Sequence, residues 1–501
     1  MAALLPEDWE LRLADLNTRR LSPEDWDWAD LVMISGMIVH RENMLALLRE
    51  AKERRKTTIV GGPYFTSVPQ EALQAGADFL VRGEAENTLP LFLTALREGK
   101  TRGVFQQNRR PDMALSPVPR FDLLHLADYD TMSIQTSRGC PYDCEFCDVV
   151  NLYGRKPRYK SPAQVIEEMA ALYRLGWRRM VFIADDNFIG NKEHARAILK
   201  KLIAWMKNHG EPFGFWTQAS VNLGQDVETI DLMTEANFAY VFLGVETPDE
   251  DVLAQSRKHH NVRTPMNLAL TNMTKNGLSV LASFMIGFDQ EMKGAGERIC
   301  RFVEENNIPL VMLNTLHALP NTSLWERLKR EGRLLEERVS GDFLAIHLNY
   351  IPSRPESEIM QEYLDAVDRL YEPSAVLRRV YQHFLAMRAT REALGLETAK
   401  NAATAGRSDH EPISLKLKEL LSLMRVIWRQ GVLAHYRWQF WRQLVGMRRK
   451  NPSRMRRYLT SCGLGENLFS IREIIARGGS SRQGKADETR DGKADIALPG
   501  S

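Results

Sequence analysis

Three cysteines within eight residues are the part of this sequence best suited to chemistry. Cys140, Cys144 and Cys147 have the spacing CxxxCxxC in the stretch RGCPYDCEFC. Three thiolates on so short a tether can ligate three irons of a 4Fe-4S cluster and leave the fourth iron open to another ligand. Cys300 and Cys462 are isolated in the sequence and offer no nearby fourth ligand. The alternative is a structural zinc site completed by a distant residue, although such sites usually contain paired CxxC ligands.

Composition indicates a globular protein of a reducing compartment. The 501 residues are 44% hydrophobic and 26% charged, which is enough for two or three domains with their own cores. The 67 basic and 64 acidic side chains leave a formal net charge of +3, so no nucleic-acid partner is expected. Five cysteines are too few for a disulfide framework, and we read no apolar run long enough to span a bilayer. We therefore expect a cytoplasmic protein, with membrane association as the alternative.

Residues 1–110 have the pattern of a small doubly wound α/β domain. Three short apolar runs predict buried parallel strands, at residues 31–35, 57–60 and 77–81. Residues 42–54 predict a helix between the first two strands. Gly61 and Gly62 follow the second strand, at the edge where open parallel sheets bind ligands. A segment rich in Pro and Arg then predicts a linker over residues 111–130.

Residues 131–325 repeat a strand followed by a helix, as in a partial (β/α)6 barrel. The strands are predicted at residues 133–136, 180–184, 213–218, 240–245, 280–286 and 310–313. Ser161, Pro162 and Gln164 form a capping box with proline at the first helical position, which predicts a helix start. Repeated βα units indicate a parallel sheet with chemistry at the carboxyl ends of its strands.

Helical patterns replace the strands afterwards and predict an all-helical domain over residues 326–477. Within it, residues 413–447 form one long or two shorter helices, with Trp428, Trp438 and several arginines bordering an apolar face. An interfacial helix that serves a lipid substrate has this pattern. A helix packed on the barrel with its arginines in solvent is the alternative, which we favour. Residues 478–501 contain few large apolar side chains and are expected to be a disordered tail.

The cysteine motif, with Phe146 before its last cysteine, resembles the signature of the radical S-adenosylmethionine superfamily. The resemblance implies that Cys140, Cys144 and Cys147 hold a 4Fe-4S cluster and that Phe146 belongs to the cofactor site. In this family the open iron binds S-adenosylmethionine, and one electron from the cluster cleaves the sulfonium to methionine and a 5'-deoxyadenosyl radical. A flavodoxin or ferredoxin is the implied electron donor.

The same resemblance implies roles for polar residues at other strand ends. Asp185 and Asp186 would bind the methionyl amine, and Glu246 would contact the ribose or the methionyl carboxylate. Gly287 would let the backbone pass close to the adenine. Three alternatives remain open, namely a helix cap at Asp186 or Asn187, a structural salt bridge at Glu246 and a helix start at Glu291.

The first domain resembles the cobalamin-binding domain that precedes many radical S-adenosylmethionine barrels. The matching stretches are IVGGP, which contains Gly61 and Gly62, and DFLVRGEAE, which ends at Glu86. These glycines would approach a corrin edge, or they would serve ordinary strand-to-helix turns. The Asp-x-His-x-x-Gly motif of other cobalamin proteins is replaced by a stretch from Asp15 that has no histidine, and we expect the domain to be N-terminally shortened.

The whole arrangement resembles the cobalamin type of this superfamily with a helical C-terminal domain, which includes the hopanoid C-2 methylases. This resemblance implies methyl transfer from cobalamin to an unactivated carbon of a lipid or another small molecule, with peripheral membrane contact. The alternatives are another radical reaction, such as methylthiolation or rearrangement, and a non-catalytic zinc protein.

Overall fold

The computed structural model describes residues 1–107, 109–339, 346–396 and 413–477, with side chains from residue 421 onward in the last range. The predicted tail, residues 478–501, lies outside the described residues. The chain divides into two compact units. Unit 1 consists of Met1–Asp130, Thr136–Trp177 and Ala318–Phe343, and unit 2 consists of Thr131–Gln135, Arg178–His317 and Leu344–Ser501.

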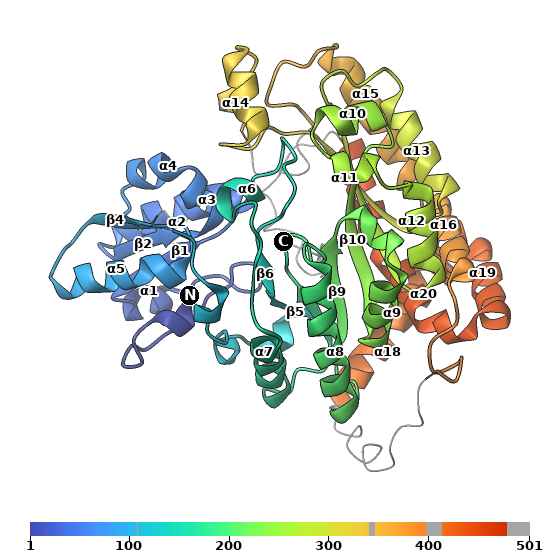
Figure 1. Ribbon diagram of the computed structural model, residues 1–501, viewed down its shortest axis with the longest axis horizontal. Helices are drawn as coiled ribbons and strands as arrows, with labels where there is room; N and C mark the ends of the chain where they lie inside the picture. The colour runs from blue at the N-terminus through green and yellow to red at the C-terminus, as the bar shows by residue number, and fades with distance from the viewer. Residues whose placement is uncertain (108, 340–345, 397–412, 478–501) are drawn as a thin grey trace. The chain divides into compact units, whose positions relative to one another are not determined.

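Unit 1 contains a parallel sheet of four strands in the order β1-β2-β3-β4 (Figure 1). The strands are β1 (Leu31–Ser35), β2 (Thr57–Gly61), β3 (Phe79–Arg82) and β4 (Gly103–Gln106). The helices of this part are α1 (Pro23–Trp28), α2 (Arg41–Glu53), α3 (Gly62–Ser67), α4 (Pro69–Gln74) and α5 (Ala85–Arg97). The three predicted strands are confirmed, whereas β4 was missed. It is a short edge strand with alternating half-buried and exposed residues, so it lacks the apolar run that identifies the other three.

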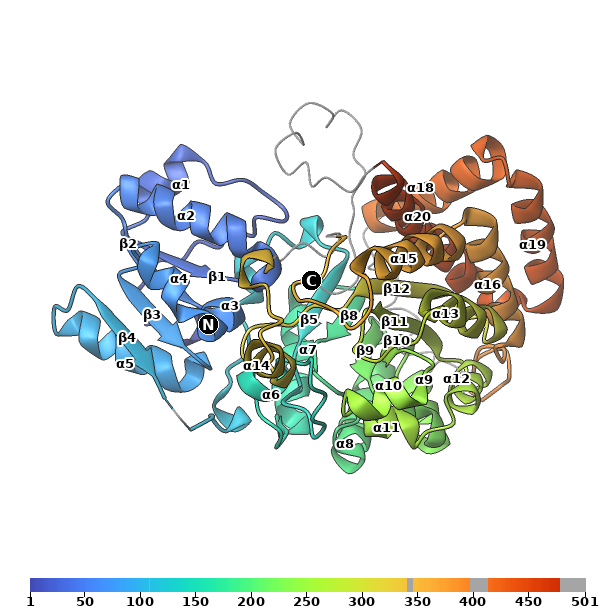
Figure 2. The same cartoon turned by 90° about the horizontal axis from the view of Figure 1, so that it is seen from above.

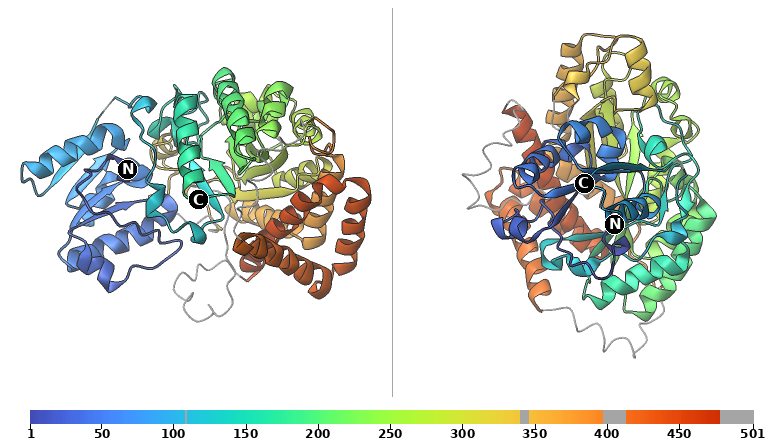
Figure 3. Two further views of the ribbon diagram at one scale, coloured as in Figure 1. Left: turned by 90° about the horizontal axis from the view of Figure 1, so that it is seen from below. Right: turned by 90° about the vertical axis from the view of Figure 1, so that its left-hand side faces the viewer.

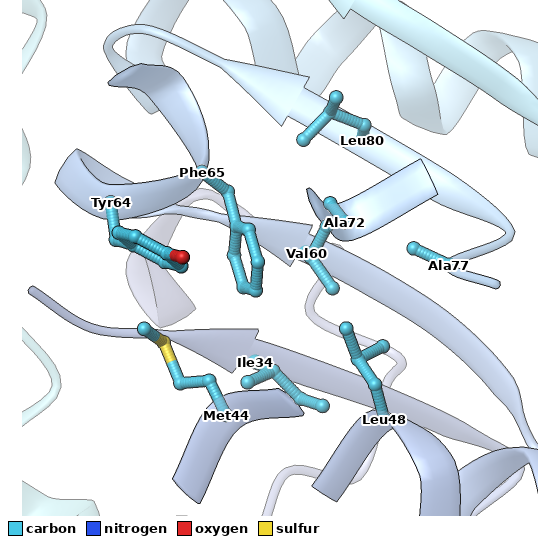
Figure 4. Close-up of a cluster of buried hydrophobic side chains, with 9 residues drawn as sticks. All are labelled: Ile34, Met44, Leu48, Val60, Tyr64, Phe65, Ala72, Ala77 and Leu80. Carbon is cyan, nitrogen blue, oxygen red and sulfur yellow. The ribbon is translucent and has the colours of Figure 1, made fainter. Parts of the chain in front are cut away.

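Both faces of this sheet are covered, as a doubly wound domain requires. Figure 4 shows the cluster on one face, in which Met44 and Leu48 of α2 pack with Val60 of β2 and Leu80 of β3. On β3 the side chains alternate between faces, so the neighbouring residue Phe79 packs in a second cluster with helix α5. The near-continuous apolar sequence of these strands follows from this two-sided burial.

The rest of unit 1 surrounds the three cysteines. Strand β6 (Ser137–Arg138) pairs antiparallel with β7 (Arg158–Tyr159), and α6 (Val149–Leu152) lies between them in the sequence. Helix α7 (Pro162–Arg174) begins at the predicted capping box, in which the Ser161 hydroxyl accepts the Gln164 amide hydrogen bond. Helix α14 (Ser323–Arg330) completes this part of the chain.

Unit 2 contains a parallel sheet of six strands in the order β12-β11-β10-β9-β8-β5, which confirms the predicted βα repeat. The strands are β5 (Thr131–Ile134), β8 (Met180–Ile183), β9 (Gly214–Ala219), β10 (Phe238–Glu246), β11 (Ser279–Ile286) and β12 (Leu310–Thr315). The intervening helices are α8 (Lys192–Asn208), α9 (Val227–Glu235), α10 (Glu250–Gln255), α11 (His259–Val262), α12 (Met266–Lys275) and α13 (Ala295–Glu305). The carboxyl ends of neighbouring strands lie along one edge of the sheet, where parallel sheets carry their chemistry.

A helical layer follows in unit 2 and packs on strand β12 of this sheet through α15 and α20. Its helices are α15 (Glu356–Leu370), α16 (Pro373–Ala386), α18 (Ile413–Trp428), α19 (Arg437–Lys450) and α20 (Met455–Ala476), and the π-helical turn η9 (Arg429–Leu433) joins α18 to α19. Figures 2 and 3 show α19 on the side of α16 that faces away from the sheet. The predicted span 413–447 is therefore two helices. Among the described residues no helix has the length and apolarity needed to cross a membrane.

Candidate functional site

The cysteine loop of unit 1 is closed tightly at its base. The Cys140 amide donates to the Gly154 carbonyl oxygen at 3.2 Å. Gly139 has a φ of 96°, and a Cβ atom there would lie 2.7 Å from the same Gly154 oxygen. Only glycine combines this left-handed conformation with so close an approach, so Gly139 is required where β6 enters the loop.

The three thiols of the loop share one environment. Cys140, Cys144 and Cys147 are half-buried, and none of the five cysteines is in a disulfide. Burial raises the pKa of the Cys147 thiol, and the acidic groups of Asp148, Cys144 and Cys140 add to this shift. The thiols are therefore within electrostatic reach of one another. Among the described residues, no three His, Cys, Asp or Glu side chains converge on a single-ion site. A 4Fe-4S cluster bonds each thiolate to a different iron, and this loop supplies three thiols at the CxxxCxxC spacing.

Two buried carboxylates hold both ends of the cysteine loop. The Arg138 guanidinium donates to Glu86 at 2.8 and 3.0 Å and to Glu84 at 2.7 Å. Arg158, on the far side of the cysteines, donates to Glu84 at 2.7 and 2.9 Å. The Glu84 and Glu86 side chains are 5% and 6% exposed. Bidentate ion pairs at this burial are strongly directional, so they fix the loop on the segment after β3.

Helix α14 contacts the same loop between two of its cysteines. The Leu324 amide donates to the Glu145 carbonyl oxygen at 2.8 Å, and Arg327 donates to the Glu145 carboxylate at 2.9 Å. Just before this helix, Asn321 accepts a hydrogen bond from the Asn151 side chain and donates to the Ser67 carbonyl oxygen. The segment after β12 therefore braces the cysteine loop.

A polar cavity of about 310 Å³ lies in unit 1 at the carboxyl ends of β3 and β4. Its lining includes Arg82, Arg109, Arg110, Asn151 and Asn321. Guanidinium and amide donors of this kind suit phosphate and amide oxygens. The position, beyond the carboxyl ends of two parallel strands, is the usual one for a ligand of a doubly wound sheet.

The predicted cofactor residues Gly61 and Gly62 are fully explained by internal packing. A Cβ atom on Gly61 would lie 3.0 Å from the Val81 carbonyl oxygen. Gly62 has a φ of 83°, and its Cβ would clash with the Ser35 hydroxyl oxygen at 2.3 Å. Both glycines fit the strand-to-helix turn that was the alternative reading, and their contact with a corrin stays a prediction.

The residues after β8 of unit 2 lie inside the protein. Asp185 is fully buried and Asp186 is half-buried. Asn187 donates from its side chain to the Ser220 hydroxyl at 3.2 Å and accepts from the Ser220 amide, which joins the ends of β8 and β9. The alternative that Asp186 or Asn187 caps a helix is wrong, because the N-cap of α8 is Asn191.

Glu246, at the end of β10, forms a buried ion pair with Lys258. Its φ is 68°, an unfavourable conformation for a residue with a side chain, and the pairing of β10 with β11 shifts register at this point. Asn261 fixes the strand end by donating to the carbonyl oxygens of Gly244 and Val245 at 3.0 and 3.1 Å. The geometry accommodates the salt bridge, and contact with S-adenosylmethionine stays a prediction for Glu246.

Gly287 follows β11 with a φ of 112° and is fixed by two side chains. Its amide donates to Glu291 at 2.9 Å, and its carbonyl oxygen accepts from the Tyr350 hydroxyl. Burial raises the pKa of Glu291 to about 7, although the Gly287 amide and Arg354 act in the opposite direction. The alternative that Glu291 starts a helix is wrong, because α13 begins at Ala295 after Gly294.

The predicted site residues thus fall into two groups. Cys140, Cys144, Cys147, Phe146, Gly61 and Gly62 belong to unit 1, and Asp185, Asp186, Glu246 and Gly287 belong to strand ends of unit 2. Phe146 is half-buried within the cysteine loop. Sequence reasoning missed the ion pairs of Arg138, Arg158 and Arg327, because their partners are remote in the chain. The one available signal was the pair Glu84 and Glu86 in the quoted stretch DFLVRGEAE.

Family models match three successive parts of the chain. Residues 2–93 match the B12 binding domain, residues 134–303 match the radical SAM superfamily, and residues 322–481 match a domain of unknown function, DUF4070. The first match covers β1 to β3 of the four-stranded sheet, and the second covers β8 to β11 of the six-stranded sheet. The third covers α14 and the helical layer.

Several known proteins with related sequences are named as methyltransferases or methylases. The chain is 46% identical to an uncharacterized methyltransferase of Synechocystis sp., over 98% of this chain and 88% of that protein. It is 34% identical to the hopanoid C-2 methylase of Rhodopseudomonas palustris, over 88% of this chain and 81% of that protein. At 22% identity it resembles the bacteriochlorophyllide d C-12(1)-methyltransferase of Chlorobaculum tepidum, over 76% of this chain and 83% of that protein.

Two solved structures have a similar fold. The cobalamin-dependent S-adenosylmethionine radical enzyme OxsB, with aqua-cobalamin and S-adenosylmethionine bound, aligns with a TM-score of 0.54 at 14% identity, over 93% of this chain and 74% of that chain. The methyltransferase TsrM of Kitasatospora setae, with cobalamin and a [4Fe-4S] cluster bound, aligns with a TM-score of 0.53 at 16% identity, over 68% of this chain and 75% of that chain. By sequence and by fold, the chain belongs to the cobalamin-binding type of the radical S-adenosylmethionine superfamily, and within this type it belongs with the methyltransferases.

Proposed function

We propose that this enzyme methylates an unactivated carbon of a hydrophobic small molecule, with a hopanoid-type lipid as the first candidate. It does so in the cytoplasm and receives electrons from a flavodoxin or ferredoxin. The relationship to the hopanoid C-2 methylase supports the substrate class, because it extends over 88% of this chain. The observation that carries the reaction class is that the three-cysteine loop is joined, through Arg138, to Glu84 and Glu86 of the B12-binding part.

The residues of the chain then have separable tasks. Cys140, Cys144 and Cys147 hold a 4Fe-4S cluster with one open iron, and the polar cavity at the ends of β3 and β4 receives amide or phosphate groups at the periphery of cobalamin. When bound, the cluster and S-adenosylmethionine supply a 5'-deoxyadenosyl radical, and cobalamin supplies the methyl group.

Residues of unit 2 bind the S-adenosylmethionine in this proposal. Asp185 and Asp186 accept hydrogen bonds from its amino group, and Gly287 presents backbone to its adenine. The hydrogen bonds of Gly287 to Glu291 and Tyr350 fix the orientation of its two peptide groups, which a positioned backbone contact needs. Glu246 supports the end of β10 through its ion pair with Lys258. In this proposal its carboxylate also contacts the ribose or the methionyl carboxylate of the ligand.

The test uses the full chain, purified without oxygen and reconstituted with iron, sulfide and cobalamin. It is incubated with dithionite, a pentacyclic hopanoid and S-adenosylmethionine labelled in its methyl group. The expected products are labelled methylhopanoid, 5'-deoxyadenosine and S-adenosylhomocysteine. Formation of methylhopanoid and of 5'-deoxyadenosine is lost in Cys144→Ala. Cys300→Ala is the matched control, because Cys300 is a buried thiol outside the loop.

Other outcomes separate the alternatives. Labelled bacteriochlorophyllide without labelled hopanoid would keep the reaction and replace the substrate. Transfer of a methylthio group would indicate a methylthiotransferase instead. Zinc in place of iron after purification, with no 5'-deoxyadenosine formed by the reconstituted chain, would reject the radical mechanism for this protein.

A further inference from the structure

The corner between α18 and α19 exposes large apolar side chains to solvent. On α18 these are Leu421, Met424 and Trp428, whose spacing places them on one face of the helix. Trp428 is 58% exposed. The turn η9 adds Val432 and Leu433, and Leu433 is 64% exposed. Exposed apolar residues this dense on one surface mark an interaction site more often than ordinary surface.

Helix α19 continues the same surface after the turn. Trp438, Trp441 and Val445 are exposed, and Trp438 reaches 75% exposure. The opposite face of α19, which includes Phe440 and Met447, is buried. Because α19 already packs on α16 through that buried face, its exposed tryptophans are not needed for the core of unit 2.

The corner is held rigidly although its apolar side chains point into solvent. The Trp441 indole donates to the Gly431 carbonyl oxygen at 2.7 Å, and the Phe440 and Trp441 rings both lie 3.2 Å from the Cβ position of Gly431. Buried Gln430 donates to the Cys462 carbonyl oxygen and to Glu466 at 2.9 and 3.0 Å. A fixed presentation of exposed tryptophans reduces the ordering cost of binding a surface.

The charged side chains in the sequence of the corner are all basic. From residue 421 to residue 465 the sequence has no Asp or Glu. Eight Arg and Lys side chains of this stretch are exposed: Arg425, Arg429, Arg437, Arg442, Arg448, Arg449, Lys450 and Arg456. Arg429 pairs with Glu466 at 3.1 Å, and the Arg437 guanidinium lies over the Trp438 ring at 5.8 Å. This distribution is strongly local, since the whole chain has a formal net charge of only +3.

We propose that the α18–α19 corner docks the enzyme on the surface of an anionic phospholipid bilayer. Trp428, Leu433 and Trp438 enter the interface between headgroups and acyl chains, where tryptophan is favoured. The surrounding arginines bind lipid phosphates, because guanidinium recognises phosphate oxygens with paired hydrogen bonds. RNA could engage the arginines and the tryptophans, but its surface offers no apolar phase for the exposed side chains of Leu421, Met424 and Leu433. A bilayer interface accepts all three kinds of side chain.

The alternative favoured from the sequence was a helix packed on the barrel with its arginines in solvent. The structure exposes Trp428 and Trp438 in addition to the arginines. Docking through the α18–α19 corner gives a role to part of the region matched by the domain of unknown function. The proposal is independent of the proposed methyl transfer, because membrane binding is measured without turnover.

The test is flotation of the full chain with vesicles of neutral phosphatidylcholine or of phosphatidylcholine with phosphatidylglycerol. We expect binding to the anionic vesicles, weaker binding at high salt and little binding to the neutral ones. Arg437→Gln with Arg442→Gln lowers the partition coefficient on the order of 30-fold, since each surface cation contributes about fivefold. Trp428→Ser with Trp438→Ser lowers it by at least a similar factor.

Matched controls change exposed residues of unit 2 elsewhere. Arg301→Gln with Arg378→Gln removes two exposed arginines, and Leu268→Ser with Met292→Ser removes two exposed apolar side chains. These controls are expected to bind like the unchanged chain. Equal binding by the corner variants, or no binding to anionic vesicles, overturns the proposal. So does self-association or RNA binding that depends on the corner while vesicle binding is absent, measured by light scattering and by filter retention.

Discussion

Arg138 lies two residues before the first cysteine of the loop and donates to both carboxylate oxygens of Glu86, at 2.8 and 3.0 Å. Both side chains are mostly buried, with 15% and 6% exposed. Arg138→Gln therefore leaves buried Glu86 without its cation, whereas Glu84 keeps Arg158. The substitution is expected to lower the free energy of unfolding by about 3–5 kcal/mol. Urea unfolding followed by circular dichroism measures this change.

Arg120→Gln is the matched control for that measurement, because Arg120 pairs with Asp122 in an exposed ion pair of the same unit. Its effect on the free energy of unfolding is expected to be much smaller, because water and salt screen an exposed ion pair. Arg138→Lys should recover only part of the stability, since an ammonium group cannot reproduce the bidentate geometry. Equal effects of Arg138→Gln and Arg120→Gln would contradict the importance of the buried network.

The raised pKa of Glu291 predicts a dependence of stability on pH. Its folded pKa of about 7 lies above its ordinary value of 4.5, because burial opposes ionisation. The contribution of the protonated carboxyl is complete below pH 4.5 and is lost as the pH rises through 7. The expected loss from this group is about 3 kcal/mol.

Glu291→Gln keeps an acceptor for the Gly287 amide and cannot ionise. Between pH 5 and pH 8 we expect the free energy of unfolding of Glu291→Gln to fall by about 3 kcal/mol less than that of the unchanged chain. Thermal unfolding at several pH values compares the two proteins, with Glu358→Gln as an exposed control on α15. Parallel pH profiles would show that Glu291 does not titrate in this range.

The ion pair between α14 and the cysteine loop is expected to slow the release of iron from a bound cluster. Arg327→Gln removes the ion pair with Glu145 of the cysteine loop, which is 2.9 Å long. Iron release to a chelator from the reconstituted chain is expected to be several times faster, whereas stability changes by about 1 kcal/mol or less because the pair is partly exposed. Arg330→Gln, on the same helix, provides the control. Unchanged release would mean that α14 does not brace the loop.

Substitutions in the buried pair of Glu246 and Lys258 distinguish a structural role of Glu246 from a role in ligand binding. Lys258→Met leaves a buried carboxylate without its cation and is expected to cost about 3–5 kcal/mol of unfolding free energy. Glu246→Gln with Lys258→Met should recover much of this loss. S-adenosylmethionine affinity, measured by equilibrium dialysis, is expected to fall in Glu246→Gln. Normal affinity in a stable Glu246→Gln protein would assign the residue to the salt bridge alone.

Local patterns in the sequence were sufficient for most of the framework. All six strands of unit 2 were placed within a few residues, because all of them except β5 are mainly apolar runs buried on both faces. The start of α7 was predicted at Ser161 from side-chain chemistry that acts over three residues. The three cysteines are equally local, since their function depends on spacing within one loop.

Contacts between remote residues could not be predicted in the same way. Glu84 and Arg158 are 74 positions apart, and Glu145 and Arg327 are 182 positions apart. No local pattern in a single sequence indicates contact between residues so far apart. Gly61 and Gly62 show a related difficulty, because tight internal packing and a nearby cofactor both require glycine. Position in the fold, and not residue type, separates these explanations.

The bonding of Glu84 to both Arg138 and Arg158 also bears on how iron enters the protein. It brings together the ends of a loop of about 20 residues, whose closure alone costs about 3 kcal/mol of chain entropy. The β6–β7 pairing shares this task. The ion pairs and the strand pairing thus offset this entropy loss without a contribution from the metal. The three cysteines are then already held on one closed loop. Iron and sulfide should therefore be accepted by the folded apoprotein, without an unfolding and refolding step.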